Sequence, residues 1–215
     1  MGDPRGSGSS VPPLLVACAL GIEQVALRSG RGAPGPVRVL RTGMGPRAAE
    51  AAVARLLGPG GAPDAAVIAS GFCAGLVPGM HPGDLVVAEE TRDADGTTPC
   101  TGTGVLVAAL ARAVPGRRVH TGPLTGSDHV VRGSERAALR AGGAIAVDME
   151  SAATLRTALC HGPRPVAAVR VVVDAPEHEL VRIGTVRGGI SAFRVLRAVL
   201  PAFYEWHRSL TLPRR

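Results

Sequence analysis

Apolar residues recur along this chain with two alternating periods. Short runs rich in Val, Ala and Leu, typical of strands buried on both faces, alternate with segments whose apolar residues recur every three to four positions, as on one face of a helix. The pattern predicts strands at residues 13–19, 36–41, 64–70, 84–90, 117–124, 144–149 and 165–174, and helices at residues 21–29, 46–57, 103–114, 134–141, 150–159 and 190–210. Pro46 suits the first turn of its helix, and Ser134 is the expected N-cap of another. Pro201 predicts a kink or break in the last helix.

This alternation predicts an α/β fold, in which helices flank a mixed, largely parallel sheet. A length of 215 residues suits one such domain. Residues 1–12 are rich in Gly, Ser and Pro and are expected to form a disordered tail, so the folded domain is expected to span residues 13–215.

Composition narrows the classes of partner. Aromatic residues make up only 2% of the chain, and the net charge of +7 comes from arginine, because the chain has no lysine. A basic balance favours anionic partners, but the arginines are scattered and lack interleaved aromatics, so nucleic-acid binding is not expected. The last predicted helix has an apolar face, which predicts packing on the sheet, with contact to a lipid surface as the alternative. That face carries Phe193, Leu196, Val199, Leu200, Phe203 and Leu210.

The four cysteines lie far apart and form no C-x-x-C pair. They predict reduced thiols in a cytoplasmic protein, without a disulfide framework or a zinc site. No metal is expected.

Three acids stand where a predicted strand passes into a helix: Glu23, Glu150 and Asp174. Ligands of open α/β sheets bind beyond the carboxyl ends of the strands, so these acids are expected to face one cleft. For any single acid, the alternative is a favourable interaction with a helix dipole. Cleavage of a glycosidic bond suits the set, since it needs an acid for the leaving group and a carboxylate to activate water or stabilise the sugar cation.

Two segments carry a family resemblance. AVDMESAA, followed by VAAVRVVVDAPE, resembles the purine nucleoside phosphorylase and methylthioadenosine/adenosylhomocysteine nucleosidase superfamily. ALGIEQVAL, RTGMGPRAA and VIASGFCAGLVPGMHPGDLVVAEE match the family in the same order, over most of residues 13–180. The resemblance implies a three-layer nucleoside phosphorylase-like fold, a homodimer or larger homo-oligomer, a small nucleoside as substrate, and no cofactor, with phosphate as a conceivable co-substrate.

The resemblance also implies roles for individual residues. Met149 would line the ribose and Glu150 would bind its hydroxyls, while Asp174 would protonate purine N7 and Glu23 would activate the attacking water. Asp174 would have to be protonated when it acts, and burial beneath the purine is expected to keep it so. Further substrate contacts are expected from a small-residue turn (Gly71, Phe72, Ala74 and Gly75) and from His129, Val130, Arg170 and Val173.

Several positions depart from the family pattern or leave alternatives open. Val173 stands where the hydrolytic branch has a serine that orients the acid. His129 stands where that branch has a base-stacking phenylalanine, and it either stacks on the purine or caps the following segment. Arg170 is expected on the same strand face as Asp174, as a brace for one of the acids or as an ordinary ion pair, and Asp148 is interpreted as structural.

The turn GMGPRA offers a second chemistry. Gly43, Gly45 and Arg47 could form an anion site at a helix N-terminus, which would serve phosphate. The same turn fits G-x-G-x-x-A, a dinucleotide-binding pattern, but the acid expected about 20 residues later is poorly placed at Asp64. The absence of arginines near ALGIEQ and ASGFCAG favours water as the nucleophile.

The segment APEHELVRIGTVRGG after Asp174 contains no aromatic residue, which predicts a wide, aliphatic pocket for the 5′ substituent. The C-terminal part resembles short hopanoid-associated phosphorylase-like proteins. That resemblance implies adenosylhopane as substrate and peripheral contact with the inner face of the membrane. Methylthioadenosine/adenosylhomocysteine cleavage and futalosine hydrolysis are the alternatives.

Overall fold

The computed structural model describes residues 12–30, 37–174 and 184–211. All but the last residue of the expected tail, 1–12, lie outside that part. The strands are β1 (Leu14–Cys18), β2 (Val37–Arg41), β3 (Ala66–Gly75), β4 (Leu85–Asp93), β5 (Gly96–Pro99), β6 (Val119–Gly126), β7 (Ala146–Asp148) and β8 (Val166–Asp174). The helices are α1 (Gly21–Arg28), α2 (Pro46–Leu57), α3 (Thr103–Ala113), α4 (Ser134–Ala141), α5 (Ser151–Cys160), α6 (Gly184–Ala198) and α7 (Leu200–Thr211).

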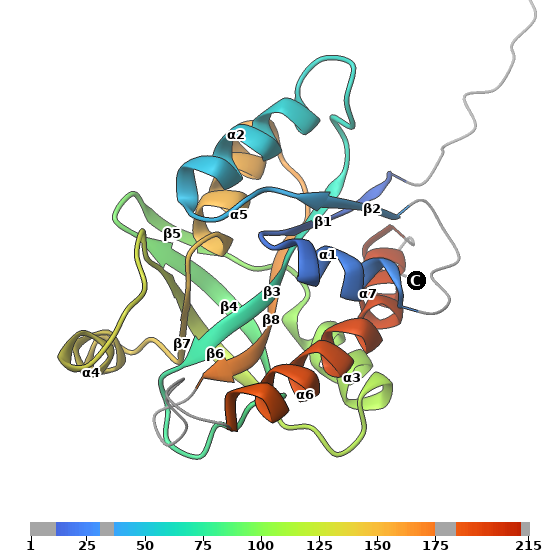
Figure 1. The fold of residues 1–215 in the computed structure, drawn as a ribbon. Helices are drawn as coiled ribbons and strands as arrows, with labels where there is room; N and C mark the ends of the chain where they lie inside the picture. Colours follow the sequence, from blue (N-terminus) through green and yellow to red (C-terminus); the bar gives the residue numbers. More distant parts are fainter. Residues whose placement is uncertain (1–11, 31–36, 175–183, 212–215) are drawn as a thin grey trace, which may run out of the picture.

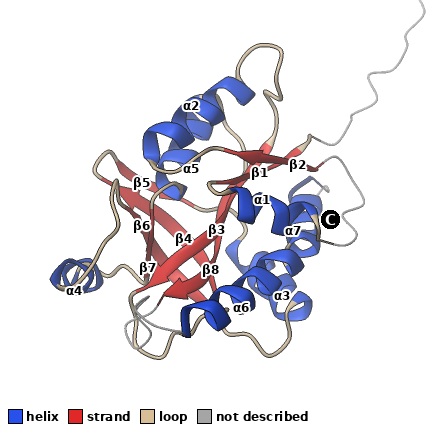
Figure 2. Cartoon of the chain, viewed as in Figure 1, coloured by secondary structure: helices blue, strands red, loops and turns tan. Residues whose placement is uncertain are grey.

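The eight strands form one mixed sheet, in the order β2-β1-β3-β7-β6-β4-β5, and β8 pairs with both β3 and β4. Five pairings are parallel, namely β1 with β2 and β3, β3 with β8, and β6 with β4 and β7. The largely parallel α/β fold is therefore confirmed (Figure 2). The pairings also close a ring through β3, β8, β4, β6 and β7, which local sequence patterns cannot reveal because every contact in it is non-local (Figure 1).

Two apolar clusters flank the sheet. One contains residues of α1, α3, α6 and α7, including Phe203 and Trp206, and packs on alternate residues of β8 such as Val169 and Val171. The other lies under α2 and α5 and takes the intervening face, including Ala168 and Val172. β8 is thus buried on both sides, as its continuous apolar run predicts.

The C-terminal helix is interrupted as predicted: α6 ends at Ala198 and α7 begins at Leu200, with Pro201 in its first turn. Its apolar face packs inside the first cluster, where Leu196 and Val199 are completely buried. The alternative of lipid contact through this face is therefore wrong. No helix in the described part of the chain is both long and apolar enough to cross a bilayer.

Three other expectations need correction. The small-residue segment Gly71–Gly75 is not a turn, because it continues strand β3 and pairs with β8 and β7. Ser134 is the first residue of α4 and not its cap; Gly133 caps the helix, without a side-chain hydrogen bond. Strand β5 was missed, since GTTP has no apolar period and is held by its hairpin with β4. The four cysteines are free, as predicted.

Candidate active site

Glu23, Glu150 and Asp174 line one cavity of about 280 Å³. They come from the N-terminal turn of α1, the N-cap of α5 and the end of β8. The expectation that the three acids face one cleft is met by this geometry. The expected residues Phe72, Ala74, His129, Val130, Met149 and Val173 also line it.

Glu23 is held by backbone donors. Its Oε2 accepts the N–H groups of Ala19 at 2.9 Å and Leu20 at 2.8 Å, and its Oε1 accepts the N–H of Phe72 at 2.7 Å. The side chain is only 2% exposed. Three N–H donors therefore fix the orientation of this carboxyl group at the cavity.

Gly71 leaves room for the side chain of Glu23. A Cβ at this position would lie 2.4 Å from Glu23 Oε1 and 2.7 Å from Arg170 Nη1, and the backbone has φ +145°. Only glycine allows both side chains to lie against the strand here. Gly71 thus shapes the site without lining the cavity. Gly75 does not line the cavity either, and it lies closely against Met80.

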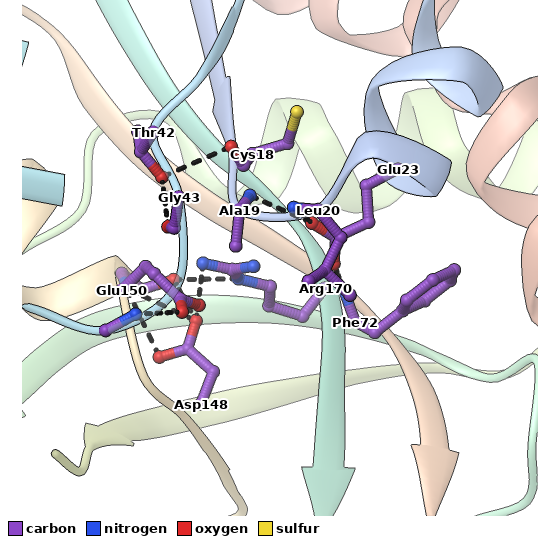
Figure 3. A network of polar contacts seen from close by, with 12 residues as sticks. Cys18, Ala19, Leu20, Glu23, Thr42, Gly43, Phe72, Asp148, Glu150 and Arg170 are labelled. Atoms are coloured by element: carbon purple, nitrogen blue, oxygen red, sulfur yellow. Dashed lines mark hydrogen bonds and ion pairs between the residues drawn. The ribbon is translucent and has the colours of Figure 1, made fainter. Parts of the chain in front are cut away.

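Arg170 and Asp148 form a buried network beneath the acids. Arg170 Nη2 lies 2.6 Å from Asp148 Oδ2, and its Nε donates to Ser151 Oγ at 2.9 Å. Ser151 Oγ in turn donates to Asp148 Oδ2 at 2.6 Å. Figure 3 shows the guanidinium pointing toward Asp148 and Glu150. Asp148 therefore fixes β8 to the start of α5, in keeping with its expected structural role, and Arg170 pairs with Asp148 and not with Asp174.

Burial opposes the charge of Arg170, but Asp148, Glu150 and Glu23 outweigh it and hold the pKa of Arg170 above its usual value. Its Nη1 is buried and has no hydrogen-bond partner among the described residues. This donor lies against the same glycine as Glu23 Oε1. Arg170 does not line the cavity, so the expected direct contact with substrate is not seen and this donor lies behind the site.

Glu150 lies on the opposite side of Arg170 from Glu23 (Figure 3). Its Oε1 accepts the N–H of Gly45 at 2.8 Å, and burial raises its pKa. The expected anion site is therefore not assembled: the Gly45 donor is taken by Glu150, and Gly43 is not among the lining residues of the cavity. Arg47 is exposed and lines a neighbouring cavity of about 480 Å³.

Asp174 has a partner that the sequence did not indicate. Arg136 Nη1 donates to Asp174 Oδ2 at 2.8 Å, and both side chains are largely buried. Asp174 is therefore not surrounded by apolar groups alone, because it has a cationic hydrogen-bond partner. The spacing of 38 residues between the two gives no local signal.

His129 borders the cavity and bonds to its neighbours. Its Nδ1 lies 2.7 Å from Asp128 and its Nε2 lies 3.0 Å from Glu135 in α4; these two hydrogen bonds raise its pKa. The ring therefore links its loop to the first turn of α4, and His129 also lines the cavity. Both predicted roles remain compatible with its place.

Cys73 is the one thiol that lines the cavity in the described part of the chain. Burial raises its pKa, so it stays a thiol and is not a candidate nucleophile. The described residues contain no group of His, Cys, Asp and Glu suited to a metal ion.

A family model described as the phosphorylase superfamily matches residues 23–201. The chain belongs to the phosphorylase superfamily. No match was found among curated proteins. The matched residues include Glu23, Glu150 and Asp174.

Solved structures share the fold of this superfamily member. The methylthioadenosine/adenosylhomocysteine nucleosidase of Neisseria meningitidis, in complex with methylthio-immucillin-A, is 23% identical, with a TM-score of 0.69, over 94% of this chain and 100% of that one. The nucleosidase of S. pneumoniae with a transition-state inhibitor is 19% identical, with a TM-score of 0.72, over 90% and 98%. The futalosine hydrolase of Helicobacter pylori is 15% identical, with a TM-score of 0.73, over 90% and 97%.

Proposed function

We propose that this protein cleaves the N-glycosidic bond of a 5′-modified adenosine and releases adenine, with water as the nucleophile. The observation that carries the proposal is that Glu23, Glu150 and Asp174, from three separate elements, surround one largely apolar cavity, which Asp148 also lines. The names of the structural neighbours, which include nucleosidases and a hydrolase of nucleosides, support the same reaction class.

Each acid has a task in this reaction. Asp174 transfers a proton to purine N7, so that the base leaves with the electron pair of the glycosidic bond. Glu150, next to Met149, accepts hydrogen bonds from the ribose hydroxyls, and its raised pKa reflects burial that the substrate's hydroxyls would offset. Glu23 takes the proton of the attacking water.

Water is preferred to phosphate for two reasons. The first is that Glu23, which lines the cavity, offers a carboxylate to take the proton of a water molecule. Among the described residues that line the cavity, none is an arginine or lysine that would neutralise a phosphate.

Adenosylhopane is the proposed substrate, with methylthioadenosine/adenosylhomocysteine and futalosine as alternatives. Met44 and Val130 line the cavity and are 63% and 62% exposed, so its entrance is apolar. An exposed apolar entrance suits a large aliphatic 5′ substituent better than a small thioether. The proposal includes transient contact of this entrance, and not of the C-terminal helix, with a membrane that holds the substrate.

The substrate test compares adenosylhopane in detergent with methylthioadenosine, each with and without phosphate, and measures free adenine by chromatography. We expect adenine from adenosylhopane in the absence of phosphate. Preference for methylthioadenosine would show that the protein is a nucleosidase of small thioadenosines. Dependence of adenine release on phosphate would show that phosphate, and not water, is the nucleophile. The Asp174→Asn protein, purified in parallel, controls for contaminating nucleosidases.

A further inference from the structure

Helix α4 contacts the rest of the chain through a charged residue, Arg136, and through Leu139, which is partly buried against an apolar cluster. It lies apart from the helices that cover the sheet (Figure 1), and Arg136 is its only buried residue. The Arg136 side chain is 10% exposed, and it reaches the site instead of solvent. The most buried side chain of this eight-residue helix is thus an arginine, and its apolar packing is limited to the partly buried Leu139.

The guanidinium joins the ends of two strands. Nη1 donates to Asp174 Oδ2 at the end of β8, and Nη2 donates to the carbonyl oxygen of Gly75 at the end of β3, each at 2.8 Å. Nε is buried and has no hydrogen-bond partner in the described part of the chain. An apolar pair would often be at least as stable as such an incompletely bonded ion pair, so stability alone does not explain the arginine.

Asp174 depends on this contact for its orientation. The preceding residue, Val173, packs against the apolar cluster and offers no hydrogen bond. Arg136 is the side chain that bonds Asp174 among the described residues, and it uses Oδ2 alone, which leaves Oδ1 without a partner. Oδ1 is itself buried, so the hydrogen bond from Arg136 to Oδ2 is the described side-chain contact that fixes the carboxyl where Asp174 lines the cavity.

We propose that Arg136 is a positioning residue that holds the carboxyl of Asp174 in place for proton transfer to the departing purine. This inference rests on the proposed function. Asp174 enters the step as the carboxylic acid, with Oδ2 accepting the hydrogen bond from Arg136. The O–H bond breaks, an N–H bond forms at N7, and the electron pair of the glycosidic bond passes to the base. Arg136 stays protonated and stabilises the carboxylate that remains.

The test is a double-mutant cycle with a matched control. Arg136→Gln is expected to lower kcat about tenfold, a part of the roughly 10²–10⁴ that a general acid contributes, and to change KM much less. Arg136→Lys keeps a charge and one donor and is expected to lie between the wild type and Arg136→Gln. Arg140→Gln, at an exposed position of the same helix, is expected to leave kcat unchanged.

The second arm of the cycle asks whether Arg136 acts through Asp174. In the Asp174→Asn background, Arg136→Gln is expected to have almost no further effect on kcat, whereas an unrelated structural role would give additive losses. All variants are assayed well below their melting temperatures, and Arg136→Lys replaces Arg136→Gln in the cycle if the latter does not fold. If Arg136→Gln keeps the wild-type kcat, or if the losses from the two substitutions add, the inference about Arg136 is wrong and the proposed function is unaffected. No base release by the wild type from any nucleoside tested would overturn the proposed function and this inference with it.

Discussion

Replacing Asp174 with asparagine is expected to lower kcat by about 10²–10⁴, the range that general acid catalysis contributes. Asparagine is nearly isosteric and lines the same cavity, but it cannot transfer a proton to purine N7. KM is expected to change far less, because binding of the ribose by Glu150 and Met149 is retained. The measurement is steady-state adenine release at saturating substrate.

The substitution also removes the anionic partner of Arg136, which is largely buried, so some loss of stability is expected. Thermal unfolding of the variant separates this loss from catalysis. Asp64→Asn is the control, since Asp64 is exposed and distant from the cavity lining. Turnover within a few-fold of wild type by a folded Asp174→Asn protein would show that Asp174 is not the acid.

Replacing Glu23 with glutamine is expected to reduce turnover by a similar factor of about 10²–10⁴, because the amide cannot accept the proton of the attacking water. The glutamine NH₂ group would also face a backbone N–H that now donates to the carboxylate, from Ala19 and Leu20 or from Phe72. A lower melting temperature is therefore expected beside the loss of activity.

Glu89→Gln is the matched control for this variant, since Glu89 is exposed and lies outside the cavity. Loss of turnover in Glu23→Gln at a temperature where it is fully folded, with affinity for adenine retained, supports the role as base. If Glu23→Gln retains turnover, a group other than Glu23 activates the water.

The sequence predicted the local features of the fold well. The apolar period of PRAAEAAVARLL and SERAALRA gave α2 and α4 their observed bounds, because helix periodicity depends on neighbouring residues alone. The run before Asp174 marked a strand buried on both faces for the same reason. Strand β3 was cut short, since SGFCAG has the glycines of a turn, although its pairing with β8 keeps it extended.

The candidate site followed the same division. Glu23, Glu150 and Asp174 were predicted from their places after strands, which is a topological rule of α/β sheets. The contacts that orient these acids were not predicted, because each contact joins distant parts of the chain. They join Phe72 to Glu23, Gly45 to Glu150, and Arg136 to Asp174. In the sequence, Arg136 is one of several arginines on a polar helix, and only the folded chain distinguishes it.

Hydrolysis in H₂¹⁸O without phosphate is the most direct test of the claim that this cavity cleaves an N-glycosidic bond with water. The purified wild-type protein is incubated with adenosylhopane, methylthioadenosine or futalosine, and the products are analysed by mass spectrometry. The account predicts free purine base from at least one of them, and one ¹⁸O atom in the matching sugar product. The account would be contradicted if none of the three nucleosides is cleaved, or if base is released only when phosphate is added.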